Sequence, residues 1–138
     1  MRYQKQDGRH LFWFNTAPVP ASRPRVSKFG TYYGKRYKQF RAAFQQEVAE
    51  FRKGFRPLLA DRLRVEASFV VPKPKSGKLV VPRGDIDNYL KALFDGCNEL
   101  VWRDDVQIVE VKATKWYGYG PTDGQMILTV EELDDEEP

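Results

Sequence analysis

The 138-residue sequence has a single cysteine, Cys97, and a single histidine, His10. One cysteine excludes an internal disulfide and is typical of a reducing compartment. Two such residues are also too few for a Cys/His zinc site. No apolar run approaches the roughly 20 residues that a membrane-spanning helix needs, and the first ten residues, MRYQKQDGRH, lack the apolar core of a signal peptide. These absences predict a soluble, cytoplasmic protein.

Acidic residues are scarce in the first part of the chain. Residues 1–56 carry 13 basic and three acidic side chains, whereas residues 57–130 carry ten of each. Residues 131–138 (EELDDEEP) hold six acids and no base, which lowers the net charge to +4. A basic first part favours a polyanionic partner, most often nucleic acid, although a basic surface kept for solubility explains the charge alone equally well. The acidic tail is predicted to be disordered.

The first half of the chain predicts a strand, a long loop and a helix. Residues 11–17 (LFWFNTA) have the aromatic content of a strand. Residues 18–37 contain three prolines and several basic side chains, and a loop of this length in a compact domain is usually functional. Residues 38–53 predict a helix that ends at Gly54, because apolar residues recur there with a helical period. Those residues are Phe40, Phe44, Val48 and Phe51.

The second half predicts one further helix and three further strands, with the segments that connect them. Residues 62–71 (RLRVEASFVV) have strand character, and residues 72–82 predict a proline-rich loop. The remaining elements are a helix over about 85–99, a strand over 106–117, a turn over 118–124 and a last strand over 125–130. The last strand is expected to form a hairpin with the strand before it.

The order of the elements, β-α-β-α-β-β, predicts the fold class α+β (or α/β), with helices packed on one mixed β-sheet. A chain with 41% hydrophobic residues is long enough to bury one core without disulfides, so we expect one domain over residues 1–130. Within it, residues 18–37 form a basic arm, and residues 131–138 follow as the tail. Cys97 and the three tryptophans are expected in the core, and His10 at the surface.

The stretch 84–96 (GDIDNYLKALFDG) crowds carboxylates at the start of the second predicted helix. Asp85 stands at the N-cap position, where an acid also favours the positive end of the helix dipole. Asp87 lies at the edge of the apolar face, and Lys91 follows one turn later. An Asp–Lys pair at this spacing is also a common surface salt bridge, so this helix alone leaves the choice between structure and chemistry open. The predicted apolar face comprises Ile86, Leu90, Leu93, Phe94 and Cys97.

A second acidic pair, Asp104 and Asp105, comes just before the strand predicted over 106–117. Aspartate favours turns, which is the simpler explanation. If Asp105 meets Asp85 and Asp87 in the fold, the three carboxylates form the hard oxygen site that Mg²⁺ prefers. Lys91 would then offset part of the negative charge or hold a phosphate. Spacing alone does not establish that the three aspartates meet.

Three motifs together resemble the RusA-type Holliday-junction resolvases. They are residues 20–25 (PASRPR), residues 84–88 (GDIDN) followed by Lys91, and residues 104–107 (DDVQ). The resemblance covers about residues 11–130, and this order of motifs in so short a chain is fairly specific. The segment 23–37 resembles the arm-bearing members found in phages and prophages, and the acidic tail lies outside the family pattern.

This resemblance implies a small homodimeric endodeoxyribonuclease of DNA recombination and repair. It would depend on Mg²⁺, with Mn²⁺ as a substitute, and resolve four-way DNA junctions by paired symmetric hydrolysis. The family's catalytic residues fall on Asp85, Asp87, Asp105 and Lys91, with Asp104 added to the metal ligands. The basic residues expected to contact DNA are Arg23, Arg25, Lys28, Lys35, Arg36, Lys73, Lys75 and Lys115. We expect no membrane, no small-molecule cofactor, and a location in the cytoplasm of a bacterial or phage-infected cell.

Two other functions stay open at this point. A non-catalytic DNA-binding module would use the basic residues on phosphates and Tyr32, Tyr33 and Tyr37 on exposed bases. It would leave both acidic clusters without a role. A Mg²⁺-dependent nuclease that acts on other branched DNA or on RNA would use the same carboxylates.

Overall fold

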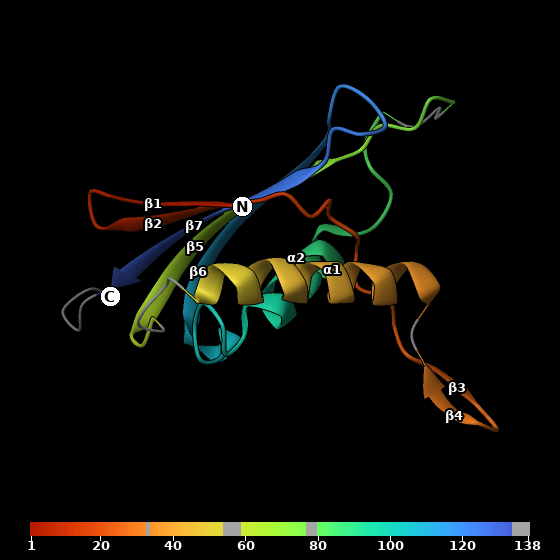
Figure 1. The fold of residues 1–138 in the computed structure, drawn as a ribbon, viewed down its shortest axis with the longest axis horizontal. Helices are drawn as coiled ribbons and strands as arrows, with labels where there is room; N and C mark the ends of the chain where they lie inside the picture. The colour runs from red at the N-terminus through yellow and green to blue at the C-terminus, as the bar shows by residue number, and fades with distance from the viewer. Residues whose placement is uncertain (33, 54–58, 77–79, 134–138) are drawn as a thin grey trace.

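The computed structural model describes residues 1–32, 34–53, 59–76 and 80–133. The helix end expected at Gly54 and the last five tail residues lie outside this part of the chain. The elements labelled in Figure 1 are β1 (Arg2–Gln6), β2 (Arg9–Phe14), β3 (Arg25–Ser27), β4 (Gly30–Tyr32), α1 (Lys35–Arg52), β5 (Arg62–Val71), α2 (Ile86–Cys97), β6 (Ile108–Tyr117) and β7 (Gln125–Leu133). A short 3₁₀ helix (Asp105–Gln107) precedes β6.

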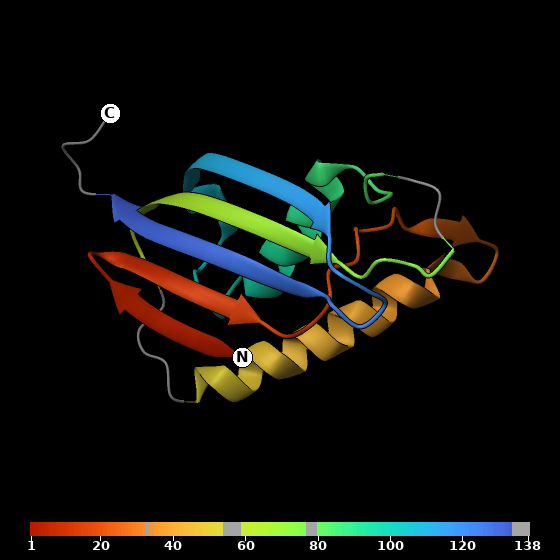
Figure 2. The same cartoon turned by 90° about the horizontal axis from the view of Figure 1, so that it is seen from above.

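Five strands form one mixed sheet in the order β1-β2-β7-β5-β6. All neighbours in the sheet are antiparallel except β5 and β6, which run parallel. Both helices lie on the same face of this sheet, as Figures 1 and 2 show. Strands β3 and β4 form a separate two-stranded hairpin within the predicted arm. The predicted class, α+β with helices on one mixed sheet, is confirmed.

The core lies between the sheet and the two helices. Strands β2, β5 and β7 alternate buried and less buried residues, because successive side chains of a strand point to opposite faces. Helix α1 adds Phe44, and α2 comes close to it at Gly96, where a Cβ atom would stand 2.4 Å from the Phe44 ring. Glycine therefore permits the close approach of the two helices. No helix in the described residues is long and apolar enough to cross a membrane.

The buried face of α2 differs from the predicted one. Tyr89, Ala92, Leu93 and Cys97 are buried, whereas Ile86 is 36% exposed. Tyr89 packs on Phe69 of β5, with ring centroids 5.5 Å apart, so the helix presents its tyrosine to the sheet. The prediction that Cys97 lies in the core is confirmed, and burial raises the pKa of its thiol.

The predicted hairpin between the last two strands is wrong. Strand β7 does not pair with β6, because β5 lies between them. After β6, at the edge of the sheet, the chain therefore passes over β5, and β7 joins the sheet on the other side of β5. Strand β7 also extends past Val130 to Leu133, so the first three residues expected in the tail belong to the sheet. Glu131 pairs there with Arg64 of β5 at 3.3 Å.

An N-terminal hairpin adds strand β1, which the sequence analysis did not predict. Asp7 and Gly8 form its two-residue turn with φ of 51° and 78°, the backbone that an Asp-Gly pair adopts readily. His10, expected at the surface, is only 5% exposed. Its Nδ1 lies 2.7 Å from the Tyr3 hydroxyl and its Nε2 3.0 Å from Glu132, because β2 pairs with both β1 and β7.

Candidate functional site

The first acidic cluster stands at the start of α2 on a tightly held loop. Lys115 of β6 donates hydrogen bonds to the carbonyls of Pro82 (2.9 Å) and Gly84 (2.6 Å). The Tyr89 hydroxyl donates to the Arg83 carbonyl at 2.6 Å. Gly84 has φ of 93°, and a Cβ there would meet Pro20 at 2.9 Å. These residues therefore hold the loop in position. Lys115 was expected to contact DNA, but its ammonium group instead hydrogen-bonds to the loop.

The carboxylates of this cluster are left available. Asp85 occupies the N-cap position of α2, but its side chain makes no capping hydrogen bond. Its backbone carbonyl accepts from Asn88 and Tyr89 instead. Asp85 and Asp87 are both exposed. The expected capping role of the Asp85 side chain is therefore wrong, and both carboxylates can take an external ligand.

Lys91 has a different partner from the expected one. Its Nζ lies 3.4 Å from Asp95, one turn towards the helix end, and not beside Asp87. Both side chains are substantially exposed, so this ion pair contributes little to stability. The i, i+4 spacing from Lys91 to Asp95 is visible in the sequence, yet the sequence analysis did not select Asp95.

The second acidic cluster is built on the DDVQ stretch. Asp104 accepts a hydrogen bond from the Val106 amide at 2.9 Å, and the Gln107 side chain accepts from the Asp104 amide at 3.0 Å. This is a reciprocal capping box on the short 3₁₀ helix. Gln107 also donates to the carbonyls of Leu59 and Asp61. Asp104 and Gln107 thus fix the loop that presents Asp105.

Asp105 is half-buried beside the C-terminal part of α2. Desolvation by burial raises the pKa of its carboxyl, and a hydrogen bond with Asp104 and repulsion from Asp104 and Asp95 raise it further. A hydrogen bond from Asn98 acts in the opposite direction. The structure therefore brings Asp105 to Asp95 and Asn98, at the opposite end of α2 from Asp85.

The four predicted metal ligands, Asp85, Asp87, Asp104 and Asp105, do not form one cluster within the described part of the chain. Over the described residues, no three His, Cys, Asp or Glu side chains come close enough together to hold a metal ion. Asp85 and Asp87 stand at the first turn of α2, whereas Asp105 lies beside its last turn. From Asp87 to Asp95 the helix rises about 12 Å, at 1.5 Å per residue.

A cavity of about 380 Å³ lies between the PASRPR segment and the two helices. The segment docks on α2 because the Ala21 amide donates to the Asn88 carbonyl over 2.9 Å. The Ser22 hydroxyl oxygen is buried beside the cavity and has no hydrogen-bond partner among the described residues. The other polar residues lining the cavity are Arg23, Arg41, Asn88, Lys91, Asp95 and Asn98.

The cavity brings together two of the predicted site residues. Arg23 and Lys91, taken from motifs far apart in the sequence, line it together. Arg41 of α1 adds a third cation that the sequence analysis did not select. Three cations with side-chain amides and a hydroxyl are suited to phosphate oxygens. Sequence reasoning missed Arg41 because nothing in a regular amphipathic helix marks which exposed base turns towards a neighbouring loop.

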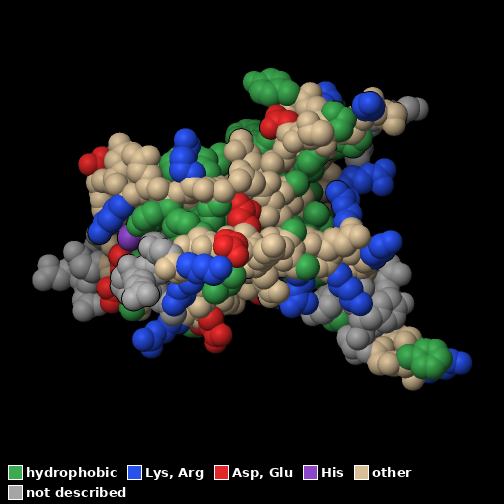
Figure 3. Space-filling view, in the orientation of Figure 1, with side chains coloured by type: hydrophobic (Ala, Val, Ile, Leu, Met, Phe, Trp, Pro, Cys, Tyr) green, Lys and Arg blue, Asp and Glu red, His purple; other side chains and the backbone are tan. Residues whose placement is uncertain are grey.

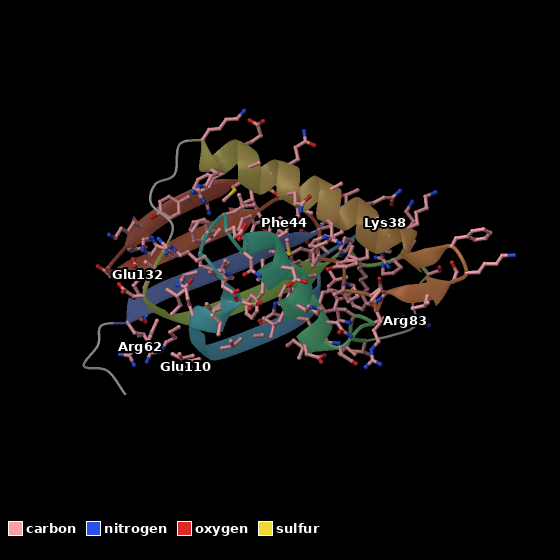
Figure 4. The ribbon with its side chains drawn as sticks, turned by 90° about the horizontal axis from the view of Figure 1, so that it is seen from below. Lys38, Phe44, Arg62, Arg83, Glu110 and Glu132 are labelled. Carbon is pink, nitrogen blue, oxygen red and sulfur yellow. The ribbon has the colours of Figure 1, made fainter. Side chains whose placement is uncertain are left out.

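Most of the other basic residues named for DNA binding are exposed. They are Arg23, Lys28, Lys35, Arg36, Lys73 and Lys75, while the side chain of Arg25 lies outside the described part of the chain. Figure 3 shows blue side chains gathered around the N-terminal end of α1, and Figure 4 places Lys38 and Arg83 at this end. The β3–β4 hairpin projects beyond it (Figure 1), with Phe29 88% exposed near its turn.

Two comparisons with known proteins show what the chain is similar to. The family model described as Endodeoxyribonuclease RusA matches residues 15–122. Over 129 residues the chain is 30% identical to the uncharacterized protein YqaN of Bacillus subtilis (strain 168), an alignment that covers 82% of this chain and 91% of that protein. The family match spans both helices, both acidic clusters and the cavity, and it leaves out β1, β2 and β7.

Proposed function

We propose that this chain, which belongs to the endodeoxyribonuclease RusA family, resolves four-way DNA junctions by paired symmetric hydrolysis of two phosphodiester bonds. The family acts on branched DNA junctions, so the general activity follows from membership. The paired symmetric cut, the use of a divalent metal, and the roles in recombination and repair inside a bacterial or phage-infected cell belong to the proposal.

The observation that carries the proposal is the cation-lined cavity of about 380 Å³ between the PASRPR segment and the two helices. Its three cations, Arg23, Arg41 and Lys91, would neutralise the backbone phosphates of a bound strand. Lys91 pairs with the carboxylate of Asp95, which also lines the cavity. We expect it to leave Asp95 for the phosphate when DNA binds, and so to stabilise charge that builds up on the phosphate during hydrolysis.

The donor chemistry of the acidic clusters fits a hard divalent cation, since Mg²⁺ and Mn²⁺ both prefer carboxylate oxygens. The geometry of one chain does not, because its carboxylates stand at opposite ends of α2. A single chain therefore does not complete the expected site. Asp85 and Asp87 are exposed and can accept a ligand from outside the chain.

The proposed symmetric cut requires two equivalent sites related by a two-fold axis, which a homodimer supplies. The same axis is present in a four-way junction with two continuous and two exchanging strands. A homodimer is therefore the assembly that we propose for the active protein.

Cleavage of a synthetic four-way junction tests the function directly. The junction, a flapped duplex, a linear duplex of the same sequence and each single strand are incubated with the protein in Mg²⁺, in Mn²⁺ and in EDTA. We expect paired nicks at symmetric positions on the junction alone, and none in EDTA. An intact junction in both metals would contradict the proposal, and equal cutting of flaps and junctions would favour a broader branched-DNA nuclease.

A further inference from the structure

A second cavity, of about 540 Å³, lies next to the cation-lined cavity and has no part in the proposed function. Three pairs of consecutive residues divide between the two cavities, with one member of each pair lining each cavity. The two cavities are therefore close neighbours. The three pairs are Pro20 and Ala21, Arg36 and Tyr37, and Asn88 and Tyr89.

The walls of the second cavity are built on the core. Val71 and Tyr117 line it at the ends of the parallel strands β5 and β6, where the two residues lie level with each other. Tyr89 of α2 forms another wall and is only 2% exposed, because its ring packs on Phe69 and its hydroxyl donates to the Arg83 carbonyl. Walls held in this way are formed before any ligand arrives, as is usual for binding pockets.

The alternation of side chains along β6 turns Tyr117 towards the second cavity and Trp116 away from it. Successive side chains of a strand point to opposite faces of the sheet. Trp116 lies on the face without helices, where it is 55% exposed and its indole nitrogen donates to the Ser68 hydroxyl at 3.2 Å. The prediction that Trp116 lies in the core is therefore wrong, whereas Trp102 is fully buried as expected. Tyr117 is thus the aromatic residue that the end of β6 presents to the cavity.

The two cavities differ in the chemistry of their walls. Cations and side-chain amides in the cation-lined cavity suit phosphate oxygens. Prolines, tyrosines and a valine make up most of the second cavity, and no acidic residue is among the described residues that line it. Its charged groups are the guanidinium groups of Arg36 and Arg83. Apolar and aromatic walls with guanidinium donors suit a flat aromatic ring that carries acceptor atoms on its edge, which describes a nucleobase.

The second cavity lies beside the first acidic cluster. Gly84 lines it and is followed directly by Asp85. A Cβ atom at Gly84 would stand 2.9 Å from Pro20 and 3.2 Å from Tyr89, so glycine lets the loop close against this wall. A phosphate near Asp85 and the base of the same nucleotide can therefore occupy adjacent places on the protein.

We propose that the second cavity binds one base of the branched DNA, extruded from the helical stack next to the phosphodiester bond that is cut. The proposal rests on the proposed function for the nature of the substrate, and it adds how the protein recognises sequence at the cut. Tyr117 provides the face on which the base stacks, and Arg36 and Arg83 donate hydrogen bonds to its edge. Extruding a base costs least where stacking is already disturbed, as it is at a branch point.

The two arginines favour guanine as the extruded base. Guanine presents two adjacent acceptors, O6 and N7, and arginine to guanine is the commonest specific contact between a side chain and a base. Adenine and cytosine instead present an exocyclic amino group, and arginine has no acceptor for it. We therefore expect cuts to concentrate where a guanine stands at one fixed position relative to the cut bond.

Sequencing of the cut sites tests the recognition of the base. Four-way junctions with random base pairs around the branch point are cleaved in Mg²⁺ by wild type, Arg36→Lys, Arg83→Lys and Arg41→Lys. Lysine keeps the charge but lacks the planar fork of donors. Wild type should prefer guanine at one position by roughly 5- to 150-fold, the discrimination that a bidentate contact provides. Arg36→Lys and Arg83→Lys should each reduce this preference.

Arg41→Lys is the matched control, because Arg41 lines the cation-lined cavity and a phosphate contact carries no sequence information. This variant should keep the preference for guanine. A wild type without any base preference, or a preference that Arg36→Lys and Arg83→Lys both retain, would overturn the proposal. Melting temperatures identify any variant that simply fails to fold.

Photochemical cross-linking tests the place of the base without cleavage. The photoreactive analogue 6-thioguanine replaces one base at a time around the branch point, and the complex with wild-type protein is irradiated in EDTA. Mass spectrometry of the digested complex should identify a cross-link to Tyr117. Tyr117→Leu should lose this cross-link, and Tyr119→Leu, which changes a fully exposed tyrosine two residues later, should keep it.

The two experiments separate the cavity from the proposed function. If wild type cross-links through Tyr117 yet cuts no junction, the proposed function fails and the base-binding cavity stands. If wild type cuts junctions but cross-links only outside the second cavity, the cavity is wrong and the proposed function stands.

Discussion

The two ends of α2 carry carboxylates in opposite circumstances. At the first turn, Asp85 and Asp87 are exposed and their side chains have no capping or ion-pair role in the described structure. At the last turn, Asp95 is paired with Lys91, and Asp105 is half-buried with a raised pKa. The first end is open to a ligand, whereas the last end is already occupied by contacts within the chain.

The two ends of α2 are therefore expected to have different roles. The first turn is expected to take part in the reaction, and the last turn is expected to stabilise the fold. The loop before the first turn is held by hydrogen bonds to its backbone from Lys115 and Tyr89, so the carboxylates remain available. The last turn is packed closely against α1 at Gly96. Substitutions at the first end should therefore change activity without changing stability, and substitutions at the last end should do more to stability.

The largest effect is expected at the first turn. Asp87→Asn, and likewise Asp85→Asn, should reduce junction cleavage by roughly a thousandfold, the upper end of the loss that follows when a group that stabilises the transition state is removed. Junction binding should be kept or improved, because a charge that repels phosphate is lost. Cleavage rates and gel-shift affinities measure the two effects separately. Asp61→Asn, another exposed aspartate, is the control, and near-normal cleavage by Asp87→Asn would remove Asp87 from the site.

Lys91 lies between the two ends of α2 and pairs with Asp95 of the last end. Lys91→Ala should lower the cleavage rate by roughly 10²- to 10³-fold if its ammonium group stabilises the reacting phosphate. The free energy of unfolding should change by no more than about 1 kcal/mol, since the pair with Asp95 is exposed. Single-turnover kinetics and urea unfolding provide the measurements. Lys53→Ala, which removes an exposed lysine from an ion pair with Glu50 at the C-terminal end of α1, serves as the control, and a loss of stability without a loss of rate would mark Lys91 as structural.

Gly96 tests the close packing of the last end. Gly96→Ala would place a Cβ 2.4 Å from the Phe44 ring, so one of the two helices must shift. We expect a loss of roughly 1–3 kcal/mol in the free energy of unfolding, as is usual for overpacking. Gly120→Ala, where nothing lies within 4 Å of the added Cβ, is the matched control. Equal stability of the two variants would show that the helices are not in close contact.

The smallest effect concerns the pH dependence of stability at Asp105. A carboxyl whose pKa is raised by folding binds its proton more tightly in the folded state, so it favours the fold at low pH and disfavours it once ionised. Asp105→Asn should therefore raise the melting temperature slightly at pH 7. The gain should disappear as the pH falls below about 4, the ordinary pKa range of aspartate. A gain that is independent of pH would contradict this origin.

Local patterns in the sequence were enough to predict several elements of the fold. Strand β5 has the bounds predicted for it, and both helices lie where apolar residues recur with a helical period. The β1–β2 hairpin was not predicted although its Asp7-Gly8 turn is a strong local signal, because β1 (RYQKQ) is almost entirely polar and lacks the apolar alternation of a strand. The predicted pairing of β6 with β7 failed for a different reason. A short turn favours a hairpin, but burial places β7 between β2 and β5.

The sequence predicted which residues belong to the candidate site better than it predicted how those residues are arranged. Motifs identified Lys91 and the aspartates, and the cavity does bring Lys91 and Arg23 together. Their contacts depend on helix rotation and loop direction, which one sequence does not show. Lys115 illustrates the limit: a basic residue on an edge strand suggests a DNA contact, yet its side chain lies on the helix face of the sheet and reaches the loop before Asp85.

The position of Lys115 has a mechanical consequence for the protein. One side chain connects the outermost strand of the sheet to the backbone beside Asp85. Any displacement of β6 along its own axis would pull on that connection and move the start of α2 with it. The position of the edge strand and the position of the carboxylates would then be coupled. Binding of another molecule to β6 would shift Asp85, where a phosphate is expected to bind.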